Sequence, residues 1–192
     1  MKISPKFVLK VAGTLTAIAL VVAALLGLVN SVTEGPIAAI NEANTKTALA
    51  AVAPDASATF EEIDIPDAAA EAAAQYATVT NIYTMSTGGY ATKIVASGSQ
   101  GNIEMIVGVD ADGAITGVSI VSNSETGGIG SKVMENKPND AGVPVLDQFV
   151  GMSGAGSLVV KSNITPISGA TVSTNGVTAG ANAALAAVEA LG

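Results

Sequence analysis

A hydroxyl-rich stretch near the C-terminus has the residue types that could hold a phosphate group. It reads Ser168-Gly169-Ala170-Thr171-Val172-Ser173, with a hydroxyl at three of its six positions and no charged side chain. Gly169 has no Cβ atom, so the backbone can approach a ligand closely there. A helix is predicted to follow the stretch, and the backbone N–H groups at the start of a helix attract anions. The stretch therefore predicts a phosphate site.

The same stretch also has a purely structural interpretation, which the residues alone leave open. Ser173 or Thr174 is an acceptable N-cap for the helix that follows, and Ser, Thr and Gly clusters are common in loops. No lysine follows the glycine, so this is not a Walker loop, and the Gly-x-Gly-x-x-Gly pattern of dinucleotide-binding folds is missing.

The composition excludes most of the chemistry that side chains perform unaided. The chain has no cysteine, which excludes disulfides, thiolate zinc sites and iron–sulfur clusters. It has no histidine, which excludes Ser-His-Asp relays and histidine-ligated haem. Residues 110–113, Asp-Ala-Asp-Gly, come nearest to a calcium loop, but the twelve-residue frame lacks its closing glutamate, and they predict a hairpin turn. Any activity must therefore come mostly from a bound prosthetic group.

One apolar segment near the N-terminus predicts a membrane anchor. Residues 11–29 carry no formal charge, and at about 1.5 Å per residue they just span a hydrocarbon core of roughly 30 Å. A cleaved signal peptide has an apolar core of only about 7–15 residues, so an uncleaved anchor is favoured. We predict a cytoplasmic N-terminus over residues 1–10 and a transmembrane helix over residues 11–32.

The charges around this segment predict its orientation. Lys2, Lys6 and Lys10 precede it, and the first acid of the chain, Glu34, follows it. The positive-inside rule then places the rest of the chain on the outer (periplasmic or extracellular) side of a plasma or inner membrane. That part carries five lysines against sixteen acids and no arginine, which argues against a nucleic-acid partner.

The remainder of the chain predicts a connecting region followed by one α+β domain. Residues 33–66 are expected to form a juxtamembrane helix and linker, with Glu34-Gly35-Pro36 ending the membrane helix. The domain spans residues 67–192, with a mostly antiparallel sheet covered by helices. Three β-branched runs predict a meander, and a further strand and several helices follow from composition and period. The strands are expected at 92–97, 102–109, 114–122 and 158–161, and the helices at 67–76, 131–136, 144–149 and 174–191.

Three segments, taken in order, resemble the covalent FMN-binding domains found in the G subunit of Rnf complexes and the C subunit of sodium-pumping NADH:quinone reductases. The stretch 168–173 is similar to the family motif Ser/Thr-Gly-Ala-Ser/Thr-x-Ser/Thr, and residues 124–132 to Ser-Glu-Thr-Pro-Gly-Leu-Gly-x-Lys. Leu146-Asp147-Gln148-Phe149 matches a third motif. Two positions depart from the family: Gly127 replaces a proline, and Thr165 replaces an acid.

The resemblance implies a site and a cofactor. In the family, the last hydroxyl of the motif, here Ser173, carries FMN through a phosphoester. Other predicted cofactor contacts are Glu125 and Thr126, near the ring or ribityl chain, and the loop residues Ser168, Gly169, Ala170 and Thr171. For Glu125, a solvated loop acid is the alternative interpretation.

The resemblance also implies a function. The chain would relay electrons within a ferredoxin:NAD⁺ oxidoreductase coupled to ion translocation, as an electron-transfer subunit of a translocase without independent catalysis. Its partners would be integral-membrane and iron–sulfur subunits, and a flavin transferase for maturation. Three alternatives stay open: the quinone-reductase C subunit, an extracellular flavin carrier outside any pump, and a non-redox surface module whose glycine loop is only structural.

Overall fold

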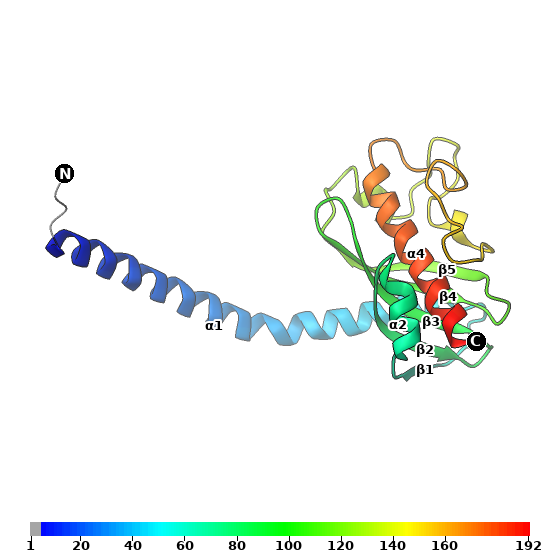
Figure 1. The fold of residues 1–192 in the computed structure, drawn as a ribbon, viewed down its shortest axis with the longest axis horizontal. Helices are drawn as coiled ribbons and strands as arrows, with labels where there is room; N and C mark the ends of the chain where they lie inside the picture. The colour runs from blue at the N-terminus through cyan, green and yellow to red at the C-terminus, as the bar shows by residue number, and fades with distance from the viewer. Residues whose placement is uncertain (1–4) are drawn as a thin grey trace. The chain divides into compact units, whose positions relative to one another are not determined.

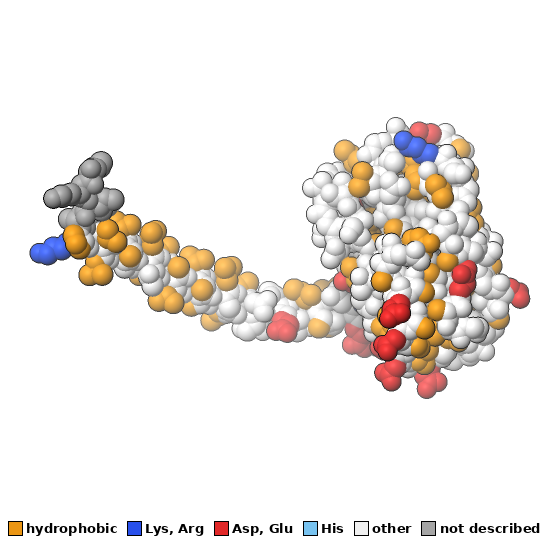
Figure 2. All heavy atoms as spheres, in the orientation of Figure 1, with side chains coloured by type: hydrophobic (Ala, Val, Ile, Leu, Met, Phe, Trp, Pro, Cys, Tyr) orange, Lys and Arg blue, Asp and Glu red, His pale blue; other side chains and the backbone are white. Residues whose placement is uncertain are grey.

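A computed structural model describes residues 5–192, which fall into two compact units that divide between Glu42 and Ala43. The first unit consists of the greater part of helix α1 (Pro5–Val52). Its large apolar side chains are exposed, as the row of orange side chains in Figure 2 shows. A helix that is apolar all round suits a lipid environment. Within residues 5–192, α1 is the one helix long and apolar enough to cross a membrane.

The prediction that Glu34-Gly35-Pro36 ends the membrane helix is wrong, because α1 continues through Pro36 to Val52. A proline in a helix removes one hydrogen bond and crowds the preceding residue. That preceding residue is Gly35, which has no Cβ atom for the proline ring to strike. The sequence also predicts a juxtamembrane helix from Ile37 to about Val52, stopped by Pro54, and the end of α1 at Val52 confirms that boundary.

The second unit is built on a five-stranded antiparallel sheet whose strand order follows the chain (Figure 1). The strands are β1 (Phe60–Ile63), β2 (Thr78–Met85), β3 (Tyr90–Ser97), β4 (Asn102–Val109) and β5 (Ile115–Asn123). The predicted meander corresponds to β3, β4 and β5. The pattern predicted no strand at β2, and it assigned β1 to the linker, whereas β1 pairs with β2 as the edge of the sheet.

Helices α2 (Asp67–Ala74) and α4 (Thr171–Leu191) cover one face of the sheet (Figure 1). Alternate residues of β4 are apolar in the sequence, which predicts one buried face, and Ile103, Met105, Val107 and Val109 do all join the core beneath these helices. Small residues on α4 let it approach closely: a Cβ atom on Gly176 would lie 2.6 Å from the Ser97 carbonyl oxygen. This close packing fixes the start of α4 against the end of β3.

The last turns of α1 cover part of the other face. Ala48, Leu49 and Val52 pack there with Met85, Ala91, Ile106 and Val121. Gly108 and Gly117 stand opposite each other on β4 and β5 and leave room for Val52. Thr116 Oγ1 donates a hydrogen bond to the Val52 carbonyl oxygen at 2.6 Å. This bond satisfies one of the carbonyls that a helix C-terminus leaves unpaired.

Between β5 and α4 the chain forms loops with two short helical pieces, α3 (Ser131–Met134) and η1 (Asp147–Phe149), close to the predicted positions. The predicted strand at 158–161 is wrong. The side-chain amide of Asn182 in α4 binds the backbone of Leu158 twice, with Nδ2 donating to the Leu158 carbonyl at 2.9 Å and Oδ1 accepting the Leu158 N–H at 3.3 Å. A side-chain amide therefore satisfies the backbone groups that a strand neighbour would satisfy.

We predict that Gly108→Ala lowers the stability of the sheet domain by about 1–3 kcal/mol. The new Cβ atom would lie 2.8 Å from the Val52 carbonyl oxygen and would displace the end of α1. Calorimetric unfolding of the full-length protein in detergent measures the effect. Gly127→Ala is the matched control, because a Cβ atom at that position would have no neighbouring atom within 4 Å. Equal melting temperatures for both variants would contradict the prediction.

Candidate functional site

Two predicted site residues that are 48 positions apart in the sequence meet in the fold. The Ser173 hydroxyl donates a hydrogen bond to Oε2 of Glu125 at 2.5 Å. Ser173 lies in the first turn of α4 and is 2% exposed, and Glu125 lies in the loop that follows β5. A hydroxyl and a carboxylate in direct contact are the arrangement in which a base activates a nucleophile.

The N-cap interpretation of Ser173 and Thr174 is wrong, because α4 begins at Thr171, three residues earlier than predicted. Its N-cap is Ala170, whose methyl side chain cannot accept a hydrogen bond. The Thr174 hydroxyl donates instead to the Ala170 carbonyl at 3.0 Å, a bond within the helix. The first-turn N–H groups of residues 171–173 have no helical acceptor and give this end a partial positive charge.

The Glu125 carboxylate joins three segments of the chain. Besides Ser173 in α4, it contacts the turn between β3 and β4, where Oε1 accepts hydrogen bonds from the Ser99 N–H at 2.7 Å and the Gln100 N–H at 3.3 Å. The backbone N–H of Glu125 in turn donates to the Asn123 side chain at 3.1 Å. Glu125 is therefore a bound side chain, and the alternative of a solvated loop acid is wrong.

Two glycines leave the space that this carboxylate occupies. A Cβ atom on Gly98 would overlap Oε1 of Glu125, and one on Gly130 would overlap Oε2. The Gly130 Cβ would also lie 2.9 Å from Ser173 Oγ. Neither glycine has a positive φ angle, so other residues could adopt its backbone conformation. Glycine is needed at both positions because a Cβ atom would overlap the carboxylate. The backbone is thus shaped around the carboxylate on both sides.

The pair faces a cavity of about 210 Å³ that contains most of the predicted site. Its lining includes five of the seven predicted residues: Glu125, Thr126, Gly169, Ala170 and Ser173. Ser168 lines a neighbouring cavity that also contains Lys132 and Lys137, and Thr171 is in neither lining. Ile129 and Val172 complete the first cavity with side chains that are 52% and 56% exposed. Its polar interior therefore opens beside two apolar side chains.

This arrangement fits FMN, a flavin that carries a phosphate group. The helix N–H groups can receive the phosphate, and Gly169, with a φ angle of 81°, turns the loop into the helix without a side chain in the way. Sites for whole drug-sized ligands measure about 300–1,000 Å³, so the cavity has room for the phosphate and ribityl part only. The flat ring would then lie at the opening, beside Ile129 and Val172.

Several residues of the site were not predicted from the sequence. The Gly-Ser-Gln-Gly segment at 98–101 has the composition of a simple turn, yet it supplies two N–H donors and one of the glycines beside the carboxylate. Its Gly and Ser content signals a turn, and nothing in its spacing points to a residue 25 positions away. The apolar pair Ile129 and Val172 was likewise missed, because single apolar residues in loops are common.

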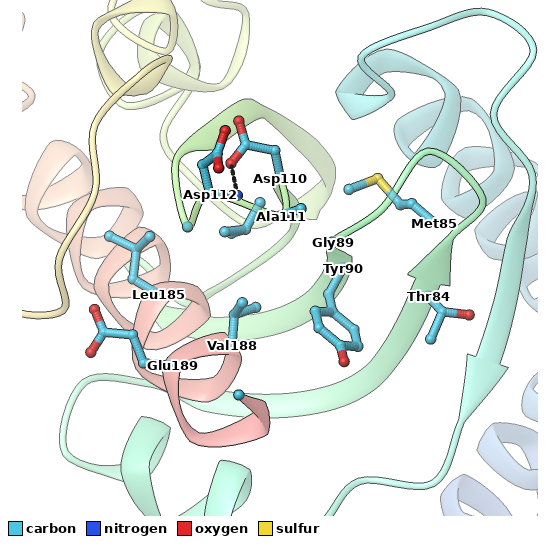
Figure 3. A pocket seen from close by; sticks show the side chains of 13 residues that line it. Thr84, Met85, Gly89, Tyr90, Asp110, Ala111, Asp112, Leu185, Val188 and Glu189 are labelled. Carbon is cyan, nitrogen blue, oxygen red and sulfur yellow. Dashed lines mark hydrogen bonds between the residues drawn. The ribbon is translucent and has the colours of Figure 1, made fainter.

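A larger cavity of about 530 Å³ lies at the other end of α4 (Figure 3). Carboxylates of Asp110, Asp112 and Glu189 line it, and no lysine does, so it disfavours a phosphate. Asp110 Oδ1 accepts hydrogen bonds from the N–H groups of Asp112 at 3.0 Å and Ala114 at 2.9 Å, as the predicted hairpin turn requires. Among residues 5–192, no group of three or more acids could hold a metal ion.

Comparison with known proteins assigns both parts of the chain. Residues 98–186 match the family model of the FMN-binding domain, and residues 1–52 match that of the RnfG N-terminal region. The first match starts at Gly98 and includes both Glu125 and Ser173. The chain therefore contains an FMN-binding domain, which follows an N-terminal apolar helix.

Full-length relatives define the family more closely. The G subunit of the Na(+)-translocating ferredoxin:NAD(+) oxidoreductase complex of Acetobacterium woodii is 32% identical over 95% of this chain and 92% of its own length. The G subunit of the ion-translocating oxidoreductase complex of Methanosarcina acetivorans is 29% identical over 90% and 89%. That of Aliivibrio fischeri is 50% identical over 40 residues, which are 21% of this chain and 19% of the relative. The chain belongs to the family of G subunits of these complexes, with a single membrane-spanning helix.

We predict that Gly130→Ala breaks the contact between Glu125 and Ser173, since its Cβ atom would occupy the position of Oε2. The carboxylate would then withdraw from the Ser99 and Gln100 N–H groups. Hydrogen exchange of these two amides should become faster, with protection in the centre of β4 unchanged. Gly127→Ala in the same loop serves as the control. Unchanged exchange at Ser99 in Gly130→Ala would show that the contact tolerates a side chain.

Proposed function

We propose that this protein is the flavoprotein subunit of an Rnf-type complex and relays electrons through FMN bound covalently to Ser173. The complex would couple ferredoxin oxidation and NAD⁺ reduction to ion translocation, as the name of the Acetobacterium relative states for that protein. One observation carries the proposal: within an FMN-binding domain, Ser173 Oγ lines the cavity at a helix N-terminus and contacts a carboxylate.

The surroundings of the other hydroxyls favour Ser173 as the attachment site. Thr174 and Thr178 donate their hydroxyls to carbonyls four residues earlier in α4, at 3.0 and 2.8 Å. Ser168 lines the neighbouring cavity, and Thr171 lines neither. Within the motif and the first two turns of α4, only Ser173 among the described hydroxyls lines the cavity that contains Glu125.

When bound, the flavin supplies the redox chemistry, and the protein supplies position and electrostatics. The N–H groups at the start of α4 hold the phosphate charge, and Thr126 offers a hydroxyl to the polar atoms of the flavin. Ile129 and Val172 offer apolar contact to the ring. A phosphoester retains the flavin without a deep pocket, which suits a cavity of about 210 Å³.

The membrane anchor and the charge pattern support an assignment of sidedness and partners. Lysines precede the apolar segment of α1 and acids follow it, so the flavin domain would lie on the outer side of the membrane. The helix would keep the flavin beside integral-membrane and iron–sulfur subunits of the complex. A flavin transferase would attach the FMN after the domain has folded.

Ser173→Ala is expected to abolish covalent flavin. Full-length protein co-expressed with a flavin transferase should gain the mass of FMN less water and keep its flavin fluorescence after denaturation, and the variant should lose both. Thr171→Ala and Thr174→Val are the matched controls and should keep the added mass. A mass gain that persists in Ser173→Ala would assign the linkage to another hydroxyl. No gain in the wild-type protein would favour a structural role for the motif.

The predicted orientation can be tested by thiol labelling, because the chain has no cysteine of its own. Glu71→Cys, on the exposed side of α2, should react in intact cells with a reagent that cannot cross the plasma membrane. In an envelope with an outer membrane, the reagent must pass that layer first. Lys6→Cys, before the membrane segment, should react only after lysis. The opposite pattern would place the flavin domain in the cytoplasm.

A further inference from the structure

We propose that Glu125 is the general base that activates Ser173 for its own flavin attachment, an inference that rests on the proposed phosphoester at Ser173. The acceptor protein would then contribute a catalytic residue to its maturation. The flavin transferase would bring the flavin donor and position its phosphates.

The proposal starts from the contact between Glu125 Oε2 and Ser173 Oγ. The distance of 2.5 Å lies within the reach that proton transfer to a base requires. Oγ is the donor in this bond and Oε2 is the acceptor. Proton transfer along this bond would leave the oxygen as a nucleophile. A serine hydroxyl is a weak nucleophile until an adjacent base activates it in this way.

The surrounding structure holds the base in position. The second carboxylate oxygen, Oε1, is anchored by the Ser99 and Gln100 N–H groups, which belong to the turn between β3 and β4. Gly98 and Gly130 have no side chain of their own, which leaves free the volume that the carboxylate fills. All three hydrogen-bond partners of the carboxylate are neutral donors. A carboxylate that only stabilised the turn would need Oε1 alone, whereas Oε2 is directed at the serine.

The chemistry of the linkage specifies the co-reactant. FMN is a phosphomonoester and does not condense with a hydroxyl in water, so an activated flavin phosphate must be supplied. A flavin dinucleotide with a pyrophosphate bond, such as FAD, meets this requirement. Ser173 Oγ attacks the phosphorus on the riboflavin side and forms a new P–O bond, and its proton passes to Glu125. The P–O bond to the bridging oxygen breaks, and adenosine monophosphate leaves with the electron pair.

In this step the start of α4 would attract the negatively charged phosphate, and Glu125 would accept the proton of the Ser173 hydroxyl. The first-turn N–H groups attract the incoming phosphate, which would draw the donor toward Oγ. The carboxylate accepts a proton and so loses its negative charge as the phosphodiester forms beside it. Afterwards Oγ has no hydrogen to donate, and like charges would separate Oε2 from the linked phosphate once the proton is released. The bonds from Oε1 to the turn can persist.

Glu125→Gln tests the proposal in full-length protein in detergent, with purified flavin transferase and FAD. The amide keeps an oxygen for the Ser99 N–H and nearly the same shape, but it does not accept the proton. Intact mass against time gives the rate of transfer as a function of acceptor concentration. We expect kcat to fall by about 10²–10⁴-fold with KM unchanged. A wild-type kcat, or a higher KM alone, would overturn the proposal in favour of structure or recognition.

Chemical rescue separates the base from a structural role, including the case in which Glu125→Gln folds poorly. Glu125→Ala leaves a gap beside Ser173 that formate can enter, and formate should restore transfer to Ser173. Formamide has a similar size but no basic carboxylate, so it should not restore transfer. Rescue by both molecules, or by neither in a folded variant, would overturn the proposal. If wild-type protein also receives no FMN, the proposed attachment itself has failed, which is a different result.

Discussion

A carboxylate held between a hairpin turn and the first turn of a helix organises the site end of this domain. Glu125 accepts hydrogen bonds from the Ser99 and Gln100 N–H groups and from the Ser173 hydroxyl, and so joins segments that are far apart in the sequence. Such a carboxylate costs free energy to remove from water unless its oxygens are paired. The turn, the loop after β5 and the helix start must therefore keep their relative positions, and Gly98 and Gly130 leave the space for it.

The two faces of the sheet pack against different helices. One face binds α4, whose small residues allow its first turn to sit at the end of β3 where the carboxylate is anchored. The other face binds the last turns of α1, with Val52 seated over Gly108 and Gly117. In both places a glycine replaces a side chain so that a helix backbone can approach the sheet. The candidate site and the last turns of α1 thus use separate faces of the same sheet.

Local patterns predicted those parts of the structure that are decided locally. Strands β3, β4 and β5 are rich in β-branched residues and have turn residues between them, and the period of α4 was recognisable. The long-range parts were not predictable in this way. β2 was missed, although it pairs with β3 along most of its length. An apolar run at Leu158 predicted a strand, but the backbone of Leu158 is bonded by the side chain of Asn182, 24 residues further on. At the candidate site, motif resemblance predicted roles for Glu125 and Ser173, but neither their contact nor the turn that anchors Glu125 follows from spacing.

The motif Leu146-Asp147-Gln148-Phe149 contributes to the site without touching it. Gln148 binds the backbone of Thr165, with Oε1 accepting its N–H at 2.9 Å and Nε2 donating to its carbonyl at 3.0 Å. Both bonds involve backbone atoms, so they hold the segment that leads into Ser168–Ser173 whichever side chain stands at position 165. The Thr165 side chain itself is exposed. An acid at this position is therefore not needed to shape the loop. With Thr165 at this position, the loop still brings the Ser173 hydroxyl into contact with the Glu125 carboxylate.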